Sequence, residues 1–246
     1  MTARVRIAAA AVPSGTVLEE LSGTEPWQPR ILGEPGNRSR RAARVALVQS
    51  RASIVRGDDV ELSVSVGEGA ALELVEIGAT LTHHARGGAP ARIEVEVSVG
   101  DGGSLTWLGA PLIVACGADV RRFVHVELAG CGRVLLGETV VLGRARERCG
   151  TLSARTRIVC DGRPTVDETL TTGDETILRS PVVAGQAGAI GSLTLAGVRD
   201  DDPPPAAMQA HGVATLWRTT GGAAETARRA APVAERWRGV LAHRTG

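Results

Sequence analysis

The residues with the clearest capacity for metal chemistry are the adjacent pair His83-His84. Imidazole nitrogens bind transition metals. Neighbouring residues of a regular strand point to opposite faces, so these two could share one ion only within a loop. The pair therefore predicts either two solvated turn histidines or a metal contact. His125 alternates with Val124 and Val126, so we expect it on the opposite strand face, exposed or hydrogen bonded.

A single carboxylate, Glu138, interrupts the apolar run 134–142. Burying a carboxylate costs free energy unless a cation pairs with it. The candidate partners nearest in the sequence are Arg133, Arg144 and Arg146. The run therefore predicts either a structural salt bridge or a polar path through an aliphatic interior. Asp167-Glu168 poses the same alternative.

Motifs of established enzyme chemistry are missing from the sequence. The glycine pairs at 67–69 and 100–103 are not phosphate loops, because no helix is predicted after them and no Lys-Ser/Thr follows. Neither a Gly-x-Ser-x-Gly nor a His-Glu-x-x-His motif occurs. No two cysteines have the Cys-x-x-Cys spacing of zinc and redox sites; they are Cys116, Cys131, Cys149 and Cys160. The sequence gives no signal for an enzyme.

These residues lie in a chain that repeats one pattern three times. Each copy is an alternating strand, a glycine-containing turn and a second strand, and the copies span 64–74, 97–107 and 126–136. A repeat of about thirty residues is typical of stacked units that cover one another's apolar faces. We therefore predict a mostly β fold of stacked strand-turn-strand units, resembling a β-helix or layered sheets.

The end of the chain departs from this pattern. The segment 200–205, three aspartates followed by three prolines, interrupts regular structure. After it, 223–243 carries apolar residues at helical spacing with arginines on the other side. We predict one domain over 1–246 with a C-terminal helical segment at about 206–246. Before it, 24–30 is predicted to be an extended loop and 177–183 to be β.

Composition restricts the possible functions. The net charge of +1 argues against a nucleic-acid-binding protein. No signal peptide and no apolar run of membrane-spanning length is present, so we expect a cytoplasmic protein without membrane contact. The arginine-rich segment 35–44 is either a solvated turn or a partner-binding patch; its arginines include Arg38, Arg40 and Arg41.

Several short motifs occur together in a fixed order between 57 and 144. They are Gly57-Asp58, Gly69-Ala70, Gly78-Ala79-Thr80, Leu105-Thr106-Trp107-Leu108 with Pro111-Leu112-Ile113, and Gly117-Ala118-Asp119. In this order and spacing the segment resembles the urease accessory protein D family, UreD, also called UreH. The chain departs from the family at Arg148-Cys149, where Gly-Glu would follow Gly143-Arg144, and at Gly109, where a proline is usual.

The resemblance implies a scaffold without catalytic turnover that assists nickel insertion into the urease apoprotein. Its implied partners are urease and the accessory proteins UreF and UreG, the latter a GTPase that carries nickel. No cofactor is expected to bind tightly, and nickel is expected to pass in transit through an internal polar path. The side chains expected to contact nickel are Thr80, His83, His84, Glu138 and Cys149. Those expected to contact partners are Arg38, Arg40, Arg41 and, on the C-terminal helix, Trp237.

A different class of function is a β-sandwich or cupin-like metal-binding domain, or an enzyme, unrelated to urease. Its ligands would be His83, His84, His125 and Glu138. Cupin-type sites need two histidines spaced two apart on one strand, and no His-x-His occurs here. The lack of a His-x-His motif disfavours the cupin-like class of function.

Overall fold

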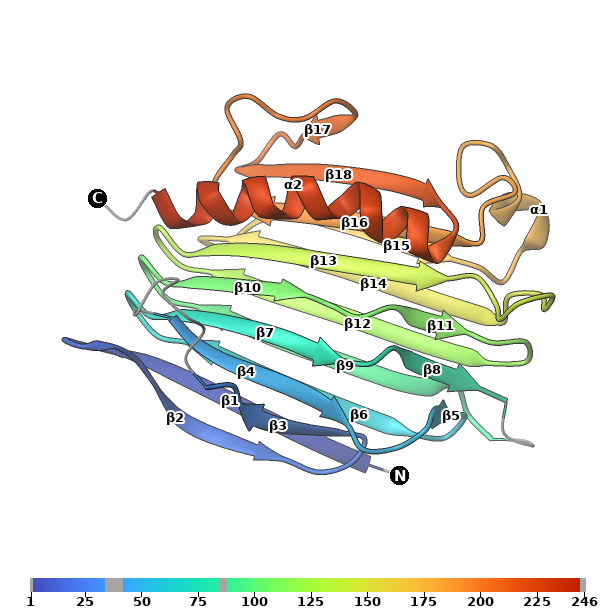
Figure 1. Cartoon of the computed structure of the whole chain (residues 1–246), viewed down its shortest axis with the longest axis horizontal. Helices are drawn as coiled ribbons and strands as arrows, with labels where there is room; N and C mark the ends of the chain where they lie inside the picture. Colours follow the sequence, from blue (N-terminus) through green and yellow to red (C-terminus); the bar gives the residue numbers. More distant parts are fainter. Residues whose placement is uncertain (1, 34–41, 85–87, 244–246) are drawn as a thin grey trace.

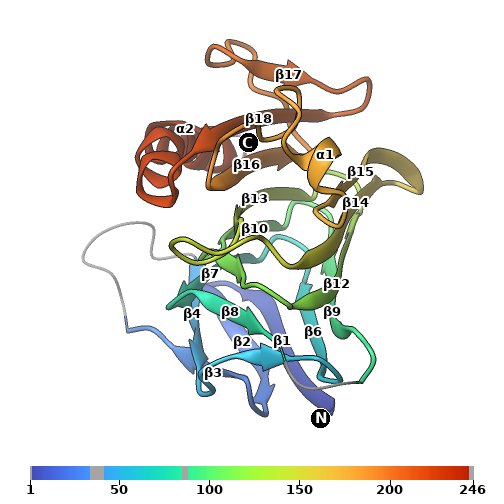
Figure 2. The ribbon, with the colours of Figure 1, turned by 90° about the vertical axis from the view of Figure 1, so that its right-hand side faces the viewer.

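The computed structural model describes residues 2–33, 42–84 and 88–243, which form two sheets stacked face to face. Figure 1 shows the strands running side by side from the N-terminal end of the stack to the C-terminal end. Figure 2 views the strands end-on, with the two sheets as facing walls. The mostly β fold of stacked units with a C-terminal helix is confirmed. None of the described helices is long and apolar enough to span a membrane.

The first sheet has seven strands in the order β15-β14-β12-β9-β6-β1-β2. Its central neighbours pair in parallel, and its two outermost pairs are antiparallel. The strands are β1 (Thr2–Val12), β2 (Gly15–Gly23), β6 (Asp59–Val66), β9 (Ala91–Val99), β12 (Asp119–Leu128), β14 (Thr151–Cys160) and β15 (Arg163–Thr171).

The second sheet has eleven strands, with the main order β17-β18-β16-β13-β10-β7-β4-β3. Three short strands extend it from β13: β11 pairs with β13, β8 with β11, and β5 with β8. The strands are β3 (Trp27–Ile31), β4 (Ala42–Gln49), β5 (Ile54–Val55), β7 (Ala71–Ile77), β8 (Thr80–His83), β10 (Ser104–Leu108), β11 (Leu112–Val114), β13 (Arg133–Val141), β16 (Ala189–Ala196), β17 (Ala207–Gln209) and β18 (Ala214–Gly221).

The three sequence repeats are three successive turns of this stack. Each contributes one strand to each sheet, as β6–β7, β9–β10 and β12–β13. The copies lie in register: Val64 pairs with Val97, and Val97 pairs with Val126. In the second sheet Trp107 pairs with both Leu74 and Leu136. Corresponding residues of the three copies therefore lie side by side in neighbouring turns of the stack.

The turns between the sheets are also linked from one repeat to the next. The Asp101 carbonyl accepts a hydrogen bond of 2.9 Å from the Gly69 amide in the preceding turn. Its Oδ1 accepts one of 2.6 Å from the Cys131 amide in the following turn. Gly69 and Gly102 occupy equivalent positions at φ +62° and +63°, in the left-handed region that favours glycine. The repeated glycines therefore shape turns that can hydrogen bond along the stack.

Asp101→Ala is expected to lower the free energy of unfolding by about 1 kcal/mol, because an amide loses its side-chain acceptor. Urea denaturation at neutral pH would measure the change. Glu68→Ala is the matched control, since Glu68 is an exposed residue at the equivalent position of the preceding turn. Equal effects of the two substitutions would show that the Asp101 contact contributes nothing specific.

A long helix, α2 (Ala223–His243), covers the outer face of the second sheet (Figure 1). It packs on β13, β16 and β18. Trp237 of the helix has no exposed surface and lies in a cluster with Leu135, Leu193 and Trp217. A second, larger aliphatic core fills the space between the sheets. The fold therefore has two apolar layers, one on each face of the second sheet.

Three predicted segments differ from the structure. The C-terminal helical segment begins at 223 and not at about 206, because β17 and β18 extend the second sheet from β16. None of 177–183 is β: the short helix α1 (Glu175–Leu178) begins after Asp174, whose Oδ1 accepts from two amides of its first turn, and turns follow the helix. Part of 24–30 is not a loop but β3, an edge strand, where a proline is tolerated.

Candidate functional site: a polar cavity between the sheets

A cavity of about 250 Å³ lies between the two sheets. It is bounded by strands of both, including β12 and β14 on one side and β7, β13 and β16 on the other. Most of its wall is apolar, with Ile93, Trp107, Val124 and Leu136 among the lining residues. Its charged and hydroxyl-bearing side chains are Glu76, Thr80, Arg122, Glu138, Thr139, Thr156, Glu168, Thr169, Ser192 and Arg218.

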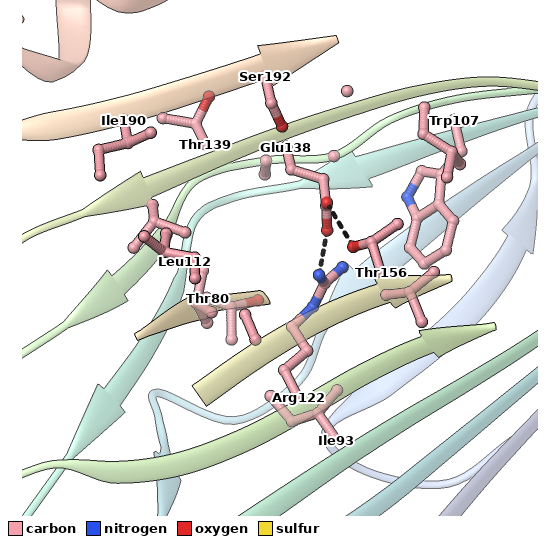
Figure 3. A pocket seen from close by; sticks show the side chains of 18 of the residues that line it. Thr80, Ile93, Trp107, Leu112, Arg122, Glu138, Thr139, Thr156, Ile190 and Ser192 are labelled. Carbon is pink, nitrogen blue, oxygen red and sulfur yellow. Dashed lines mark hydrogen bonds and ion pairs between the residues drawn. The ribbon is translucent and has the colours of Figure 1, made fainter. Parts of the chain in front are cut away.

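Glu138 projects from β13 into this cavity (Figure 3). Its Oε1 forms an ion pair with Arg122 of β12, which reaches across from the other sheet. Its Oε2 accepts a hydrogen bond of 3.1 Å from the Thr156 hydroxyl on β14. Glu138 is therefore salt bridged, and it also lines the cavity between the sheets.

The arginine that pairs with Glu138 differs from the three candidates near it in the sequence. Arg144 instead pairs with Glu147, whose pKa this contact lowers to about 2. Arg133 lies on the same strand as Glu138, five residues away, and is not among the residues lining the cavity. The pairing with Arg122 crosses from sheet to sheet, so it depends on how the sheets stack and not on distance along the chain.

A second carboxylate, Glu76, stands at the same cavity from β7. Its Oε1 accepts a hydrogen bond of 2.9 Å from Trp107 Nε1, and its Oε2 accepts one of 3.1 Å from the Ala110 amide. Burial raises the pKa of Glu76, an effect opposed by the positive charge of Arg122 and by these two donors. Glu76 and Glu138 therefore share the electrostatic field of one guanidinium.

Glu76 and Arg122 were not identified from the sequence, although a signal was present. Leu72 and Leu74 of β7 face the core. Glu76 is the next residue on the same strand face, two positions after Leu74. Arg122 likewise stands between the inward residues Val120 and Val124. A charge at an inward position of an alternating strand is the pattern that would have found both.

A second ion pair, between Glu168 of β15 and Arg218 of β18, lies at the same cavity. Arg218 pairs in register with Ser192, and Ser192 with Glu138, so the three positions form one row across the second sheet. Asp167 is instead exposed and pairs with Arg155 at 2.7 Å. The two neighbouring carboxylates thus differ in place: Asp167 lies on the outer surface, and Glu168 lies at the cavity. Polar side chains follow the cavity across several strands.

The other predicted nickel contacts lie in different places. Thr80 of β8 is buried and lines the cavity together with Glu138. His83 ends β8 with its Nδ1 2.8 Å from the His84 carbonyl oxygen, and His84 is exposed. Neither histidine lines the cavity. Cys149 is partly buried against an apolar cluster, and this burial raises the pKa of its thiol. Of the predicted set, the structure brings together Thr80 and Glu138.

The four ligands of a cupin-like site do not converge. His125 projects from the first sheet and lies 3.2 Å from the exposed carboxylate of Glu127, whereas Glu138 lines the interior. Among residues 2–33, 42–84 and 88–243, no three His, Cys, Asp or Glu side chains are grouped so that they could hold a metal ion. A resident ion bound by these four side chains is therefore not supported.

Of the residues predicted to contact partners, the structure describes Trp237. Trp237 does not lie on the surface as predicted: it is fully buried beneath α2, and its Nε1 donates to Asp200 Oδ2 at 2.9 Å. Its large apolar side chain serves helix packing, which the sequence pattern could not separate from partner binding. Arg38, Arg40 and Arg41 lie outside the described residues.

The sequence of the chain is similar to those of known proteins. The family model described as "UreD urease accessory protein" matches residues 1–245. The chain is 43% identical over 162 residues to "Urease accessory protein UreD 1" of Streptomyces griseus, a match spanning 65% of this chain and 63% of that protein's length. It is 33% identical over 205 residues to "Urease accessory protein UreD 2" of Saccharopolyspora erythraea, covering 83% of this chain and 71% of that protein. With "Urease accessory protein UreD" of Streptomyces avermitilis the identity is 30% over 230 residues, or 92% and 89%.

Proposed function

Because the chain belongs to the UreD family of urease accessory proteins, we propose that it assists nickel insertion into the urease apoprotein as a scaffold without turnover of its own. Its working partners are urease, UreF and the GTPase UreG, and its setting is the cytoplasm. Nickel is its cargo and passes through the cavity between the sheets. The arginine-rich segment carrying Arg38, Arg40 and Arg41 is the proposed partner contact.

The observation that supports this proposal is a group of charged side chains at the cavity between the sheets. Glu76, Arg122 and Glu138 line one cavity whose other walls are largely apolar. Interior charges are expensive and are retained where they pair or serve a function. Carboxylate and hydroxyl oxygens can each contact a passing cation, and several weak contacts allow release where one tight site would trap the ion. His83, His84 and Cys149 stay as proposed further contacts outside this cavity.

The test replaces Glu138 by glutamine in cells that express urease together with its accessory proteins. Urease activation is expected to fall by about tenfold, as is common when a side chain supporting a metal is lost. Assembly of the complex, measured by pull-down, is expected to remain intact because glutamine is nearly isosteric and can still accept from Thr156.

Glu127→Gln is the matched control, since Glu127 is an exposed carboxylate on the other sheet and should leave activation unchanged. Normal activation by the Glu138 variant would remove that residue from the nickel path. Loss of the complex in the pull-down would instead assign Glu138 a structural role alone.

A further inference from the structure

Arg122 is an unusual side chain for its position. In register with it on the neighbouring strands are Ile93 and Ala154. Ile93 is 1% exposed, and Val120 and Val124, which flank Arg122 on the same strand face, are also 1% exposed. Three aliphatic side chains thus surround the inward position that the arginine occupies, where a fourth would extend the core. A guanidinium at this position needs a carboxylate, and it extends into the cavity to reach one.

The two oxygens of Glu138 have separate partners. Oε1 pairs with Arg122, whereas Oε2 accepts from the Thr156 hydroxyl at 3.1 Å. Removing the guanidinium would therefore leave the carboxylate oriented by Thr156. Glu76 lies within the electrostatic field of Arg122 and is its alternative anionic neighbour at this cavity. One permanently charged guanidinium thus acts on two carboxylates, Glu76 and Glu138. It forms an ion pair with one oxygen of Glu138.

We propose that Arg122 is a built-in counter-cation that holds the Glu138 carboxylate until a divalent cation displaces it. The proposal rests on the proposed function, since it assigns a control to the same cavity. A guanidinium remains charged at all physiological pH values, so it competes with a metal ion by charge and not by protonation. The same Glu138 oxygen cannot keep its pairing with Arg122 and fully bind an entering ion.

This competition makes the cavity a weak cation site in the resting protein. Arginine has a long stem, so the guanidinium can leave Glu138 for the carboxylate of Glu76 without moving β12. An entering ion then meets Glu138, already oriented by Thr156. When the ion departs, Arg122 restores the pair. Arg122 thereby acts as a positioning residue for the cargo and favours its release.

The experiment measures Ni²⁺ binding to the purified full-length chain by isothermal titration calorimetry. Arg122→Met keeps the length of the stem and removes the charge, and we expect it to bind Ni²⁺ at least about tenfold more tightly than the wild type. Adding Glu138→Gln to this variant is expected to abolish the gain. Arg122→Lys keeps a cation and should bind like the wild type.

Arg155→Met is the matched control, because it removes an ion-paired arginine from the outer surface of the same sheet. Unchanged or weaker Ni²⁺ binding by folded Arg122→Met would overturn the proposal, as would an equal gain in the Arg155 variant. If Arg122→Met fails to fold, Arg122→Gln provides the same comparison. Because the readout is binding to the chain alone, it can succeed or fail independently of the urease activation measured for Glu138.

Discussion

Trp237→Ala is expected to lower the free energy of unfolding by about 4 kcal/mol, the middle of the range for truncating a buried tryptophan. The side chain has no exposed surface and fills the layer between α2 and the second sheet. Its removal leaves a cavity beside Leu193 and Trp217 and removes a donor to Asp200. Urea denaturation followed by circular dichroism would measure the loss.

The matched control is Arg228→Ala, at an exposed position of the same helix, which should change stability by less than about 0.5 kcal/mol. A Trp237 variant as stable as the wild type but unable to bind urease or an accessory protein would contradict the structural role. It would restore Trp237 as a partner contact. The size of the stability change therefore separates the two roles of this residue.

The repeating part of the fold was predictable because its information is local. Alternation fixes which side chains face inward, and the spacing of the three copies places Val64, Val97 and Val126 in adjacent strands. Neither signal depends on segments distant in the sequence. The stacked architecture followed from these two patterns, and the late helix from the helical spacing of the apolar residues in 223–243.

The segments that were predicted wrongly take their structure from distant partners. β18 is a strand because it pairs along its length with β16, and 214–221 alone has no clear alternation. β3 is a strand because it extends the edge beside β4. In such segments tertiary pairing overrides local preference, so the sequence near them does not determine the outcome.

For the same reason, only part of the candidate site could be predicted from the sequence. Glu138 was identifiable as a carboxylate within an apolar run, and Glu76 and Arg122 as charges at inward strand positions. The facing of the two sheets brings Arg122, 16 positions from Glu138, to the cavity, and the strand order of the second sheet brings Glu76, which is 62 positions away. Alternation predicts that a charge points inward but not which charge it meets.

Asp200→Ala is expected to lower the free energy of unfolding by about 2.5 kcal/mol. Asp200 is buried between α2 and the sheet, and it accepts from Trp237 Nε1 at 2.9 Å and from Arg236 at 2.6 and 2.8 Å. Without it, the buried indole donor loses its acceptor. Arg236 is partly exposed and can turn to water, so most of the loss comes from the indole and from the freed Asp202 amide. Arg236→Ala should therefore destabilise less than Asp200→Ala.

The same carboxylate predicts a pH dependence of stability with a defined sign. Hydrogen bonds from Arg236 and Trp237 hold the pKa of Asp200 below its ordinary value, although burial acts in the opposite direction. Folding thus makes this group more acidic, so its stabilisation is fully present above the unfolded pKa of about 3.9 and is lost as the pH falls through the folded pKa. The stability difference between wild type and Asp200→Asn should consequently be constant from neutral pH to about pH 5 and shrink in more acidic solution. Urea denaturation at a series of pH values would measure this difference, and a difference that grows towards low pH would show that Asp200 is protonated in the folded protein.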